Sequence, residues 1–128
     1  DLGDELKAHA KRLNLGDSVT FSGFVNPIEA MGRSDMIVQL SVWENCSYTL
    51  LDAKAAGLKT VATAVGGNPE ILEADELVDR QSPKLTEDVL QAMRRQLQKG
   101  DAEPFTWISN EQMAAQTAHI YTRILEKK

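Results

Sequence analysis

The chain has 128 residues, 42% of them hydrophobic and 26% charged, with a net charge of −5, which favours one globular domain over two. The negative charge argues against a nucleic-acid partner, and no apolar run approaches the roughly 20 residues of a membrane span. A single cysteine and the lack of a Cys/His cluster with metal spacing favour a reducing, cytoplasmic compartment and no metal site.

The N-terminal part predicts a helix, a strand and a short capped helix. The apolar side chains that recur at helical spacing in the first helix are Leu2, Leu6, Ala10 and Leu13. Gly16 ends that helix, and the alternation over residues 19–24 predicts a strand. Asn26 followed by proline is typical of a helix start, so a short helix should continue from there to Ser34.

The middle of the chain alternates strand and helix patterns. Residues 36–40 are almost continuously apolar, as expected of a strand that is covered on both faces. A helix is predicted over 48–56, a β-branched strand over 59–63 and a brief strand at 77–78. Residues 66–68 form a turn, after which a short helix begins.

Two longer helices are predicted at the C-terminal end, one over about 83–99 and one after a Ser109 cap. The side chains expected to face inward are Leu85, Val89, Ala92 or Met93, Leu97, Met113, Ile120, Ile124 and Leu125. Because β and α units alternate, the fold class is α/β, with a Rossmann-like parallel sheet flanked by helices in a single domain over residues 1–128.

Two carboxylates in the middle of the chain, Glu44 and Asp52, are its most informative feature. Glu44 lies just past the carboxyl end of the strand over 36–40, and Asp52 lies about one turn into the next helix. In an open α/β sheet, ligands bind in the crevice at that position. The free N–H groups and positive dipole end of the helix attract anions. The pair therefore predicts a site for a polyhydroxyl ligand that carries phosphate.

The central block resembles the C-terminal, nucleotide-sugar-binding domain of family 4 glycosyltransferases (glycosyltransferase group 1), which are GT-B enzymes. The matching segments are Val19–Val25, Ser34–Val38, Ser41–Ala53, Ala56–Leu58, Val61–Ile71 and Phe105–Trp107. Their order and spacing are more specific than any single motif. The resemblance implies a retaining enzyme that transfers a hexose from a UDP- or GDP-sugar to a saccharide or lipid acceptor, with no cofactor beyond that donor.

The resemblance also implies the residues that hold the donor sugar. Glu44 matches the first acid of the Glu-x7-Glu signature, the catalytic acid that faces the sugar near the reaction centre. The residues of the loop that contacts the sugar are Asn45, Cys46 and Ser47.

The nucleotide would be held by the next segment. Tyr48 and Thr49 would present backbone N–H groups to the diphosphate, and Asp52, matching the second acid, would hold the ribose hydroxyls. The residues that match the turn near the base are Gly23, Phe24 and Val25.

The sequence departs from the family pattern in and behind this site. Asp52 replaces the usual Glu, so its carboxylate stops about 1.5 Å earlier, roughly one carbon–carbon bond. Ribose hydrogen bonds of about 1–3 kcal/mol each would weaken or run through water. Ser47 and Lys59 stand where Pro is frequent, and Lys54 and Thr60 stand where apolar residues are common. Each change adds polarity to the helix–strand unit.

Other parts of the family's enzyme have no counterpart in the sequence, and we expect a chain truncated at its N-terminal side. The first strands of the domain, with a glycine loop carrying Arg and Lys, and the acceptor-binding N-terminal domain are not matched. We therefore expect no transfer by the isolated chain. In a full-length enzyme the site would be cytoplasmic or peripheral at the membrane. Unpaired strand edges would favour a homo-oligomer. The alternative is a non-catalytic truncated or engineered α/β fragment that serves as a folding or assembly module.

Overall fold

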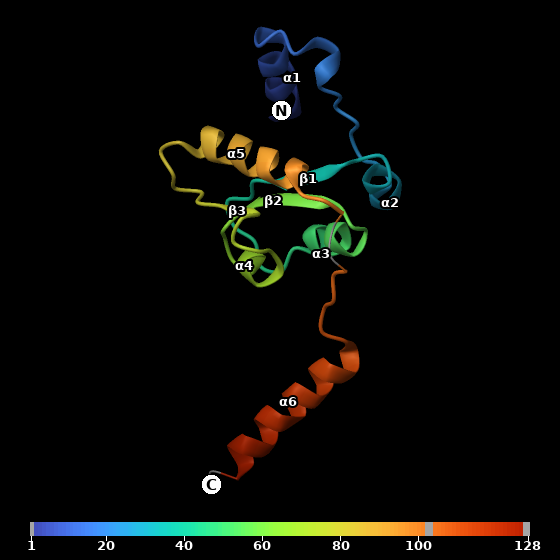
Figure 1. The fold of residues 1–128 in the computed structure, drawn as a ribbon, viewed down its shortest axis with the longest axis vertical. Coiled ribbons are helices and arrows are strands. Elements are labelled where there is room, and N and C mark those ends of the chain that lie inside the picture. Colours follow the sequence, from blue (N-terminus) through green and yellow to red (C-terminus); the bar gives the residue numbers. More distant parts are fainter. Residues whose placement is uncertain (1, 102–103, 127–128) are drawn as a thin grey trace. The chain divides into compact units, whose positions relative to one another are not determined.

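The computed structural model describes residues 2–101 and 104–126, and the chain divides into two compact units, Asp1–Arg33 and Ser34–Lys128. The first unit contains α1 (Leu2–Arg12), the 3-10 turn η1 (Gly16–Ser18) and α2 (Pro27–Met31), which Figure 1 shows in blue and cyan. Asn26 caps α2 as predicted, because its side-chain oxygen accepts hydrogen bonds from the amides of Ile28 (2.9 Å) and Glu29 (3.4 Å).

The predicted strand over residues 19–24 is not formed. Val19 has extended backbone angles, but within the described residues no strand pairs with this segment, and the side chain of Phe21 is 44% exposed. A strand is stabilised by its ladder and cross-strand contacts, so an extended segment without a neighbour stays irregular. Leu2 and Leu6 of α1 are exposed and Ala10 is partly buried, because α1 has no buried residue and packs no apolar face into a core.

The second unit is built on a three-stranded parallel sheet with strand order β1-β2-β3. The strands are β1 (Met36–Gln39), β2 (Lys59–Thr63) and β3 (Leu77–Val78), and Met36 pairs with Lys59 while Ala62 pairs with Leu77. Helices α3 (Tyr48–Ala55) and α4 (Asn68–Ile71) lie on one side of the sheet and α5 (Leu85–Gln98) on the other (Figure 1). This arrangement confirms the predicted α/β class.

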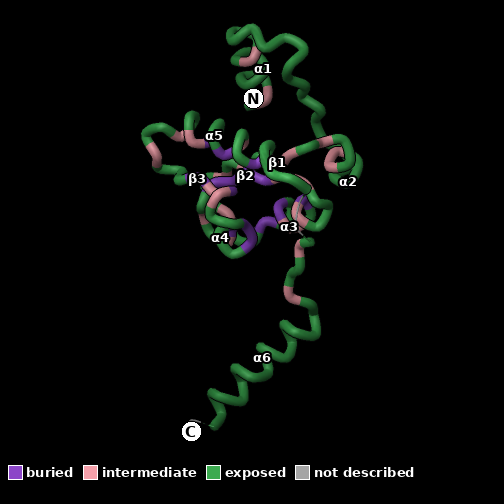
Figure 2. Tube along the Cα trace, in the orientation of Figure 1, coloured by how far each residue is buried: buried purple, intermediate pink, exposed green. Residues whose placement is uncertain are grey.

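The side chains of β2 divide the core into two clusters, one on each face of the sheet. Ala62 packs with Leu50 of α3 and with Ile71 and Leu72, whereas Val61 packs with Val78 and with α5. The α5 residues in the second cluster are Val89 and Ala92. Figure 2 shows the buried residues gathered on β2 and on the helix faces turned toward it. Burial on both faces explains why β2 is stable as a central strand.

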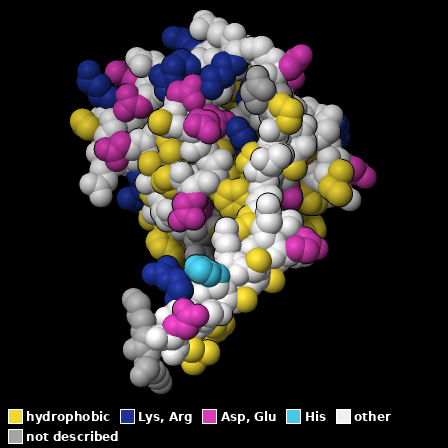
Figure 3. Space-filling view, turned by 60° about the horizontal axis from the view of Figure 1, so that its bottom comes forward, with side chains coloured by type: hydrophobic (Ala, Val, Ile, Leu, Met, Phe, Trp, Pro, Cys, Tyr) yellow, Lys and Arg dark blue, Asp and Glu magenta, His cyan; other side chains and the backbone are white. Residues whose placement is uncertain are grey.

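Three expectations about burial are wrong. Strand β1 is only partly covered, with Val38 39% exposed, because in the described structure it pairs with β2 alone. Leu97 of α5 is 60% exposed. Helix α6 (Asn110–Leu125) begins with the capping box of Ser109 and Gln112, but its expected inward residues are at least half exposed. Figure 3 shows apolar side chains along its surface. Periodicity predicts the helix, not the surface that would cover it.

Among the described residues, no helix has both the length and the apolar character that crossing a bilayer requires.

Candidate functional site

The loop between β1 and α3, residues 40–47, contains the predicted acid and is called the Glu44 loop below. The side chain of Gln39 forms hydrogen bonds with two of its residues, Glu44 and Ser47. Gln39, the last residue of β1, donates from Nε2 to Glu44 Oε2 at 2.9 Å. Its Oε1 accepts a hydrogen bond from Ser47 Oγ, also at 2.9 Å. The second Glu44 oxygen accepts from the Asn45 amide at 3.2 Å. Gln39 thus fixes the position of the Glu44 carboxylate relative to the start of α3.

Ser47 is the N-cap of α3. It is buried, and its Oγ accepts a hydrogen bond from the Leu50 amide at 3.2 Å. Within the described chain, the amides of Tyr48 and Thr49 have no hydrogen-bond acceptor, as expected of the first turn of a helix. The side chains of both residues are exposed. The start of α3 therefore presents free N–H donors beside a held carboxylate.

A glycine turn after β2 packs directly against this loop. Gly66 has a φ of +52°, and a Cβ placed there would lie 1.5 Å from the carbonyl oxygen of Glu44. A Cβ on Gly67 would lie 2.2 Å from the carbonyl oxygen of Asn45, which accepts a hydrogen bond from the Gly67 amide at 3.0 Å. Only glycine allows this approach. The sequence identified a turn here but not its contact with the loop, although two adjacent glycines after a strand were the signal.

Two further contacts hold the end of β2 to its neighbours. Thr63 donates from Oγ1 to the carbonyl of Ser41 at 2.7 Å, and Asn68 donates from Nδ2 to the carbonyl of Thr63 at 3.0 Å. Both side chains are fully buried. These two hydrogen bonds connect the glycine turn, β2 and the Glu44 loop. The sequence analysis predicted neither contact.

The remaining predicted residues of this unit are exposed around the loop. Asn45, Cys46 and Asp52 are all accessible, and the Cys46 thiol is free. Asp52 lies in the second turn of α3, and within the described residues its carboxylate has no hydrogen-bond partner. The structure thus brings Glu44 and Ser47 together and leaves Asp52 exposed to solvent. The ligand contacts expected of these residues stay predictions.

The predicted base-binding residues belong to the first unit. Gly23 has a φ of +65°, Phe24 is fully exposed and Val25 is 37% exposed. They lie in the irregular segment before α2, and their predicted contact with a base remains a prediction. In the described part of the chain, no three His, Cys, Asp or Glu side chains gather as metal ligands.

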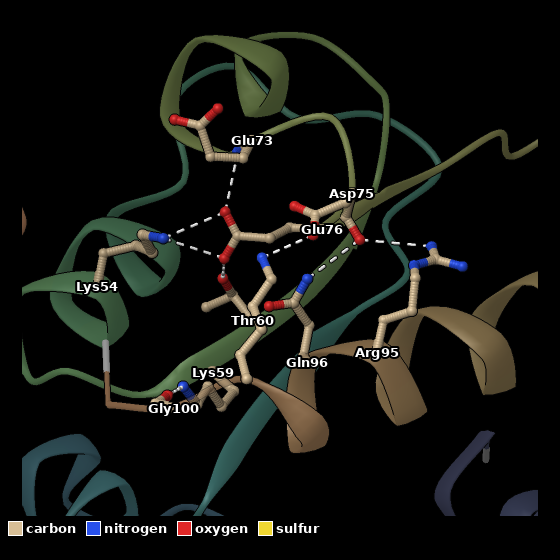
Figure 4. Close-up of polar contacts among 10 residues, drawn as sticks. Lys54, Lys59, Thr60, Glu73, Asp75, Glu76, Arg95, Gln96 and Gly100 are labelled. Atoms are coloured by element: carbon tan, nitrogen blue, oxygen red, sulfur yellow. Dashed lines mark hydrogen bonds and ion pairs between the residues drawn. The ribbon is translucent and has the colours of Figure 1, made fainter. Parts of the chain in front are cut away.

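A buried polar network lies at the other end of α3. Glu76, 3% exposed, accepts two hydrogen bonds from Lys54 Nζ, at 3.0 and 3.1 Å, and one from Thr60 Oγ1 at 2.5 Å. The amide of Glu73 donates to the same carboxylate at 2.9 Å. Figure 4 shows Lys54 and Thr60 converging on Glu76 from α3 and β2. Two of the four polar departures from the family pattern, Lys54 and Thr60, are therefore partners of one carboxylate.

The second unit is a Rossmann-like α/β sheet, and in open α/β sheets the carboxyl ends of the strands, where Glu44 and the start of α3 lie, are the usual position of a ligand. The chain matches the family described as "Glycosyl transferases group 1" over residues 2–103. It therefore belongs to that family of glycosyltransferases, which confirms the resemblance drawn from the sequence.

One characterised relative is similar over part of the chain. It is the N-acetyl-alpha-D-glucosaminyl L-malate synthase of Bacillus anthracis, 38% identical over 64 residues. The similar segment covers 49% of this chain and 17% of that relative, so the chain spans only a small part of the relative's length. No solved structure gives a significant match.

Proposed function

We propose that this chain is the nucleotide-sugar-binding part of a retaining glycosyltransferase that transfers a hexose from a UDP- or GDP-sugar to a saccharide or lipid acceptor. Membership of the family supports sugar transfer in general. The single observation that carries the finer proposal is the Gln39 bridge, which holds the Glu44 carboxylate and the Ser47 cap on one short loop.

The arrangement suits the two chemical halves of such a donor. Glu44 carries two acceptor oxygens for sugar hydroxyls, and Gln39 and the Asn45 amide hold its orientation. The free amides of Tyr48 and Thr49 would donate to the diphosphate at the positive end of α3. In this proposal Asp52, on the next turn, accepts hydrogen bonds from the ribose, and Asn45, Cys46 and Ser47 line the sugar.

The positive charge that the protein offers to the diphosphate determines how strongly we expect the donor to bind. Lys54, the lysine of α3, is paired with Glu76 and so is not available to a phosphate. The helix start then carries the leaving-group charge within the described site, and electrostatic stabilisation of that charge is often the largest catalytic term. We therefore expect weak donor binding by this chain. The acceptor would be held by the N-terminal domain of a GT-B enzyme, in the cytoplasm or at a membrane surface.

Calorimetric titration tests the proposal. UDP, GDP and their hexose conjugates are titrated against the chain, a Glu44→Ala variant and a Glu87→Ala control, which removes an exposed acid of α5. We expect millimolar binding of at least one sugar conjugate, and about tenfold weaker binding of that conjugate by Glu44→Ala. Binding of the free nucleotide should not change, because Glu44 is proposed to contact the sugar. No heat from any nucleotide or conjugate would refute donor binding.

The alternative function, a self-associating assembly module, is favoured by the open edge of the sheet. In the described structure β1 pairs only with β2, and Val38 is 39% exposed. An unpaired edge is a template for another chain. Light scattering should then report a dimer that Val38→Lys dissociates, and a monomer at every concentration would refute the alternative.

A further inference from the structure

A hollow of about 530 Å³ lies in the second unit between α4 and the segment before α6. The residues that line it are Lys54, Glu70, Ile71, Glu73 and the segment Pro104–Trp107. It shares no residue with the Glu44 loop or the glycine turn. Its volume is within the range of small-molecule sites, which bind through an apolar wall and a few placed polar groups.

The wall of the hollow is a stacked aromatic pair. The rings of Phe105 and Trp107 lie 6.0 Å apart, centroid to centroid, at an interplanar angle of 21°. Phe105 packs against the core cluster that contains Leu50 and Ala62, which anchors the pair to the fold. Trp107 is 42% exposed, so part of the indole stays accessible. An anchored and accessible aromatic surface can stack on the apolar C–H face of a sugar ring.

The charged side chains of the hollow determine which polar groups a ligand must carry. Glu70 and Glu73 are exposed carboxylates, and the Lys54 ammonium is already paired with Glu76 at 3.0 Å. The available charge is therefore negative, which disfavours a phosphate or another anion. Ionised carboxylates only accept hydrogen bonds, so the ligand must bring donors. Sugar hydroxyls supply donors around the edge of a ring whose face is apolar.

We propose that this hollow binds a saccharide, with one ring stacked on Trp107 and its hydroxyls donating to Glu70 and Glu73. The site is separate from the Glu44 loop, and the proposal does not depend on donor binding there. The saccharide is neutral or cationic, since the lining offers no free cation among the described residues.

Tryptophan fluorescence tests this site on the full chain. The chain has two tryptophans, so a Trp43→Phe background leaves Trp107 as the reporter. Glucose, maltose and glucosamine are titrated into the millimolar range. We expect a saturable change with at least one of them, and half-saturation raised about fivefold or more when Glu70 and Glu73 are replaced by Gln. A Glu87→Gln control, on exposed α5 surface, should bind the sugar unchanged.

Two comparisons make the result decisive. A Trp107→Phe variant leaves Trp43 as the reporter, and the saturable signal should then disappear. Inorganic phosphate should give no saturable change in the Trp43→Phe background, where Trp107 is the reporter. A non-saturable response to every sugar, or equal binding by the variant with both glutamates replaced, would overturn the proposal. Stronger binding of a lysine pentapeptide than of any sugar would also overturn it, because the hollow would then be a site for cationic peptides.

Discussion

Replacing Lys54 by Met should destabilise the second unit strongly, because it leaves the carboxylate of Glu76 buried without its cation. Glu76 is 3% exposed and accepts two of its four side-chain hydrogen bonds from Lys54. Breaking a buried ion pair by removing one partner costs about 3–5 kcal/mol. Since the Lys54 side chain is 21% exposed, water can enter, and we expect about 3 kcal/mol, a large part of the ~5–15 kcal/mol of a typical domain.

Native-state hydrogen exchange at the Ala62 amide measures this loss directly. That amide donates to the backbone carbonyl of Glu76 at 2.9 Å, so its protection reports the opening of β2 beside the network. The matched control is Lys99→Met, which breaks the Lys99–Asp75 pair in the same unit. Both of its side chains are more than 40% exposed, and such pairs contribute about 0–1 kcal/mol.

A triple variant separates the buried-charge explanation from a general intolerance of this region. Combining Lys54→Met with Thr60→Val and Glu76→Leu replaces the three side chains of the network by apolar ones of similar size. The amide of Glu73, an exposed residue, then donates to water in place of Glu76. Replacing complete buried ion pairs is often neutral or stabilising, so protection at Ala62 should return to within about 1 kcal/mol of the parent. The triple variant could instead lose as much opening free energy at Ala62 as the sum of the losses in Lys54→Met, Thr60→Val and Glu76→Leu measured singly. That result would refute the explanation by an uncompensated buried charge.

Three other changes have definite expected outcomes. Gly66→Ala should unfold the Glu44 loop and abolish the proposed nucleotide binding. Gly57→Ala, with a φ of +73° and no neighbour within 4 Å, should cost only about 1–2 kcal/mol in thermal unfolding and keep that binding. Asp52→Glu should tighten UDP binding by up to about tenfold in calorimetry, and an unchanged affinity would contradict a ribose contact. The hydrogen bond from Lys99 lowers the pKa of Asp75, so their contribution to stability is present above the ordinary carboxyl pKa and lost as the pH falls through the lowered value. Lys99→Ala should raise that pKa in a carboxyl NMR titration, and an unchanged midpoint would argue against the contact.

Local signals in the sequence predicted the elements well, because their causes lie within a few residues. Asn26 and Ser109 both cap the helices that they were expected to start. The β-branched strand over 59–63 is the central strand of the sheet. Residues 19–24 failed because a strand depends on a partner that a local pattern does not contain. The same limit applies to α6, whose apolar stripe is present but uncovered in the described structure.

The Glu44 loop was predicted in part. Glu44 and Ser47 were identified, and the structure places both on one hydrogen-bonded loop. Gln39 and the glycine pair were missed as supports because they contact the loop from other elements. A signal for Gln39 was available, since an amide at the end of an otherwise apolar strand needs a polar partner. The steric contact of Gly66 with Glu44 could not be read from sequence, because it depends on how two loops approach.

The polar residues behind the site acquire a common explanation in the structure. In the sequence, Lys54 and Thr60 are separate departures from an apolar family pattern, and each adds polarity to the helix–strand unit. In the fold both donate to Glu76, so each compensates the burial of the same carboxylate. Neither can change to an apolar residue alone without cost. Because α3 is held to Glu76 at its last turn and to Gln39 through Ser47 at its first, the position of its first-turn amides depends on both contacts.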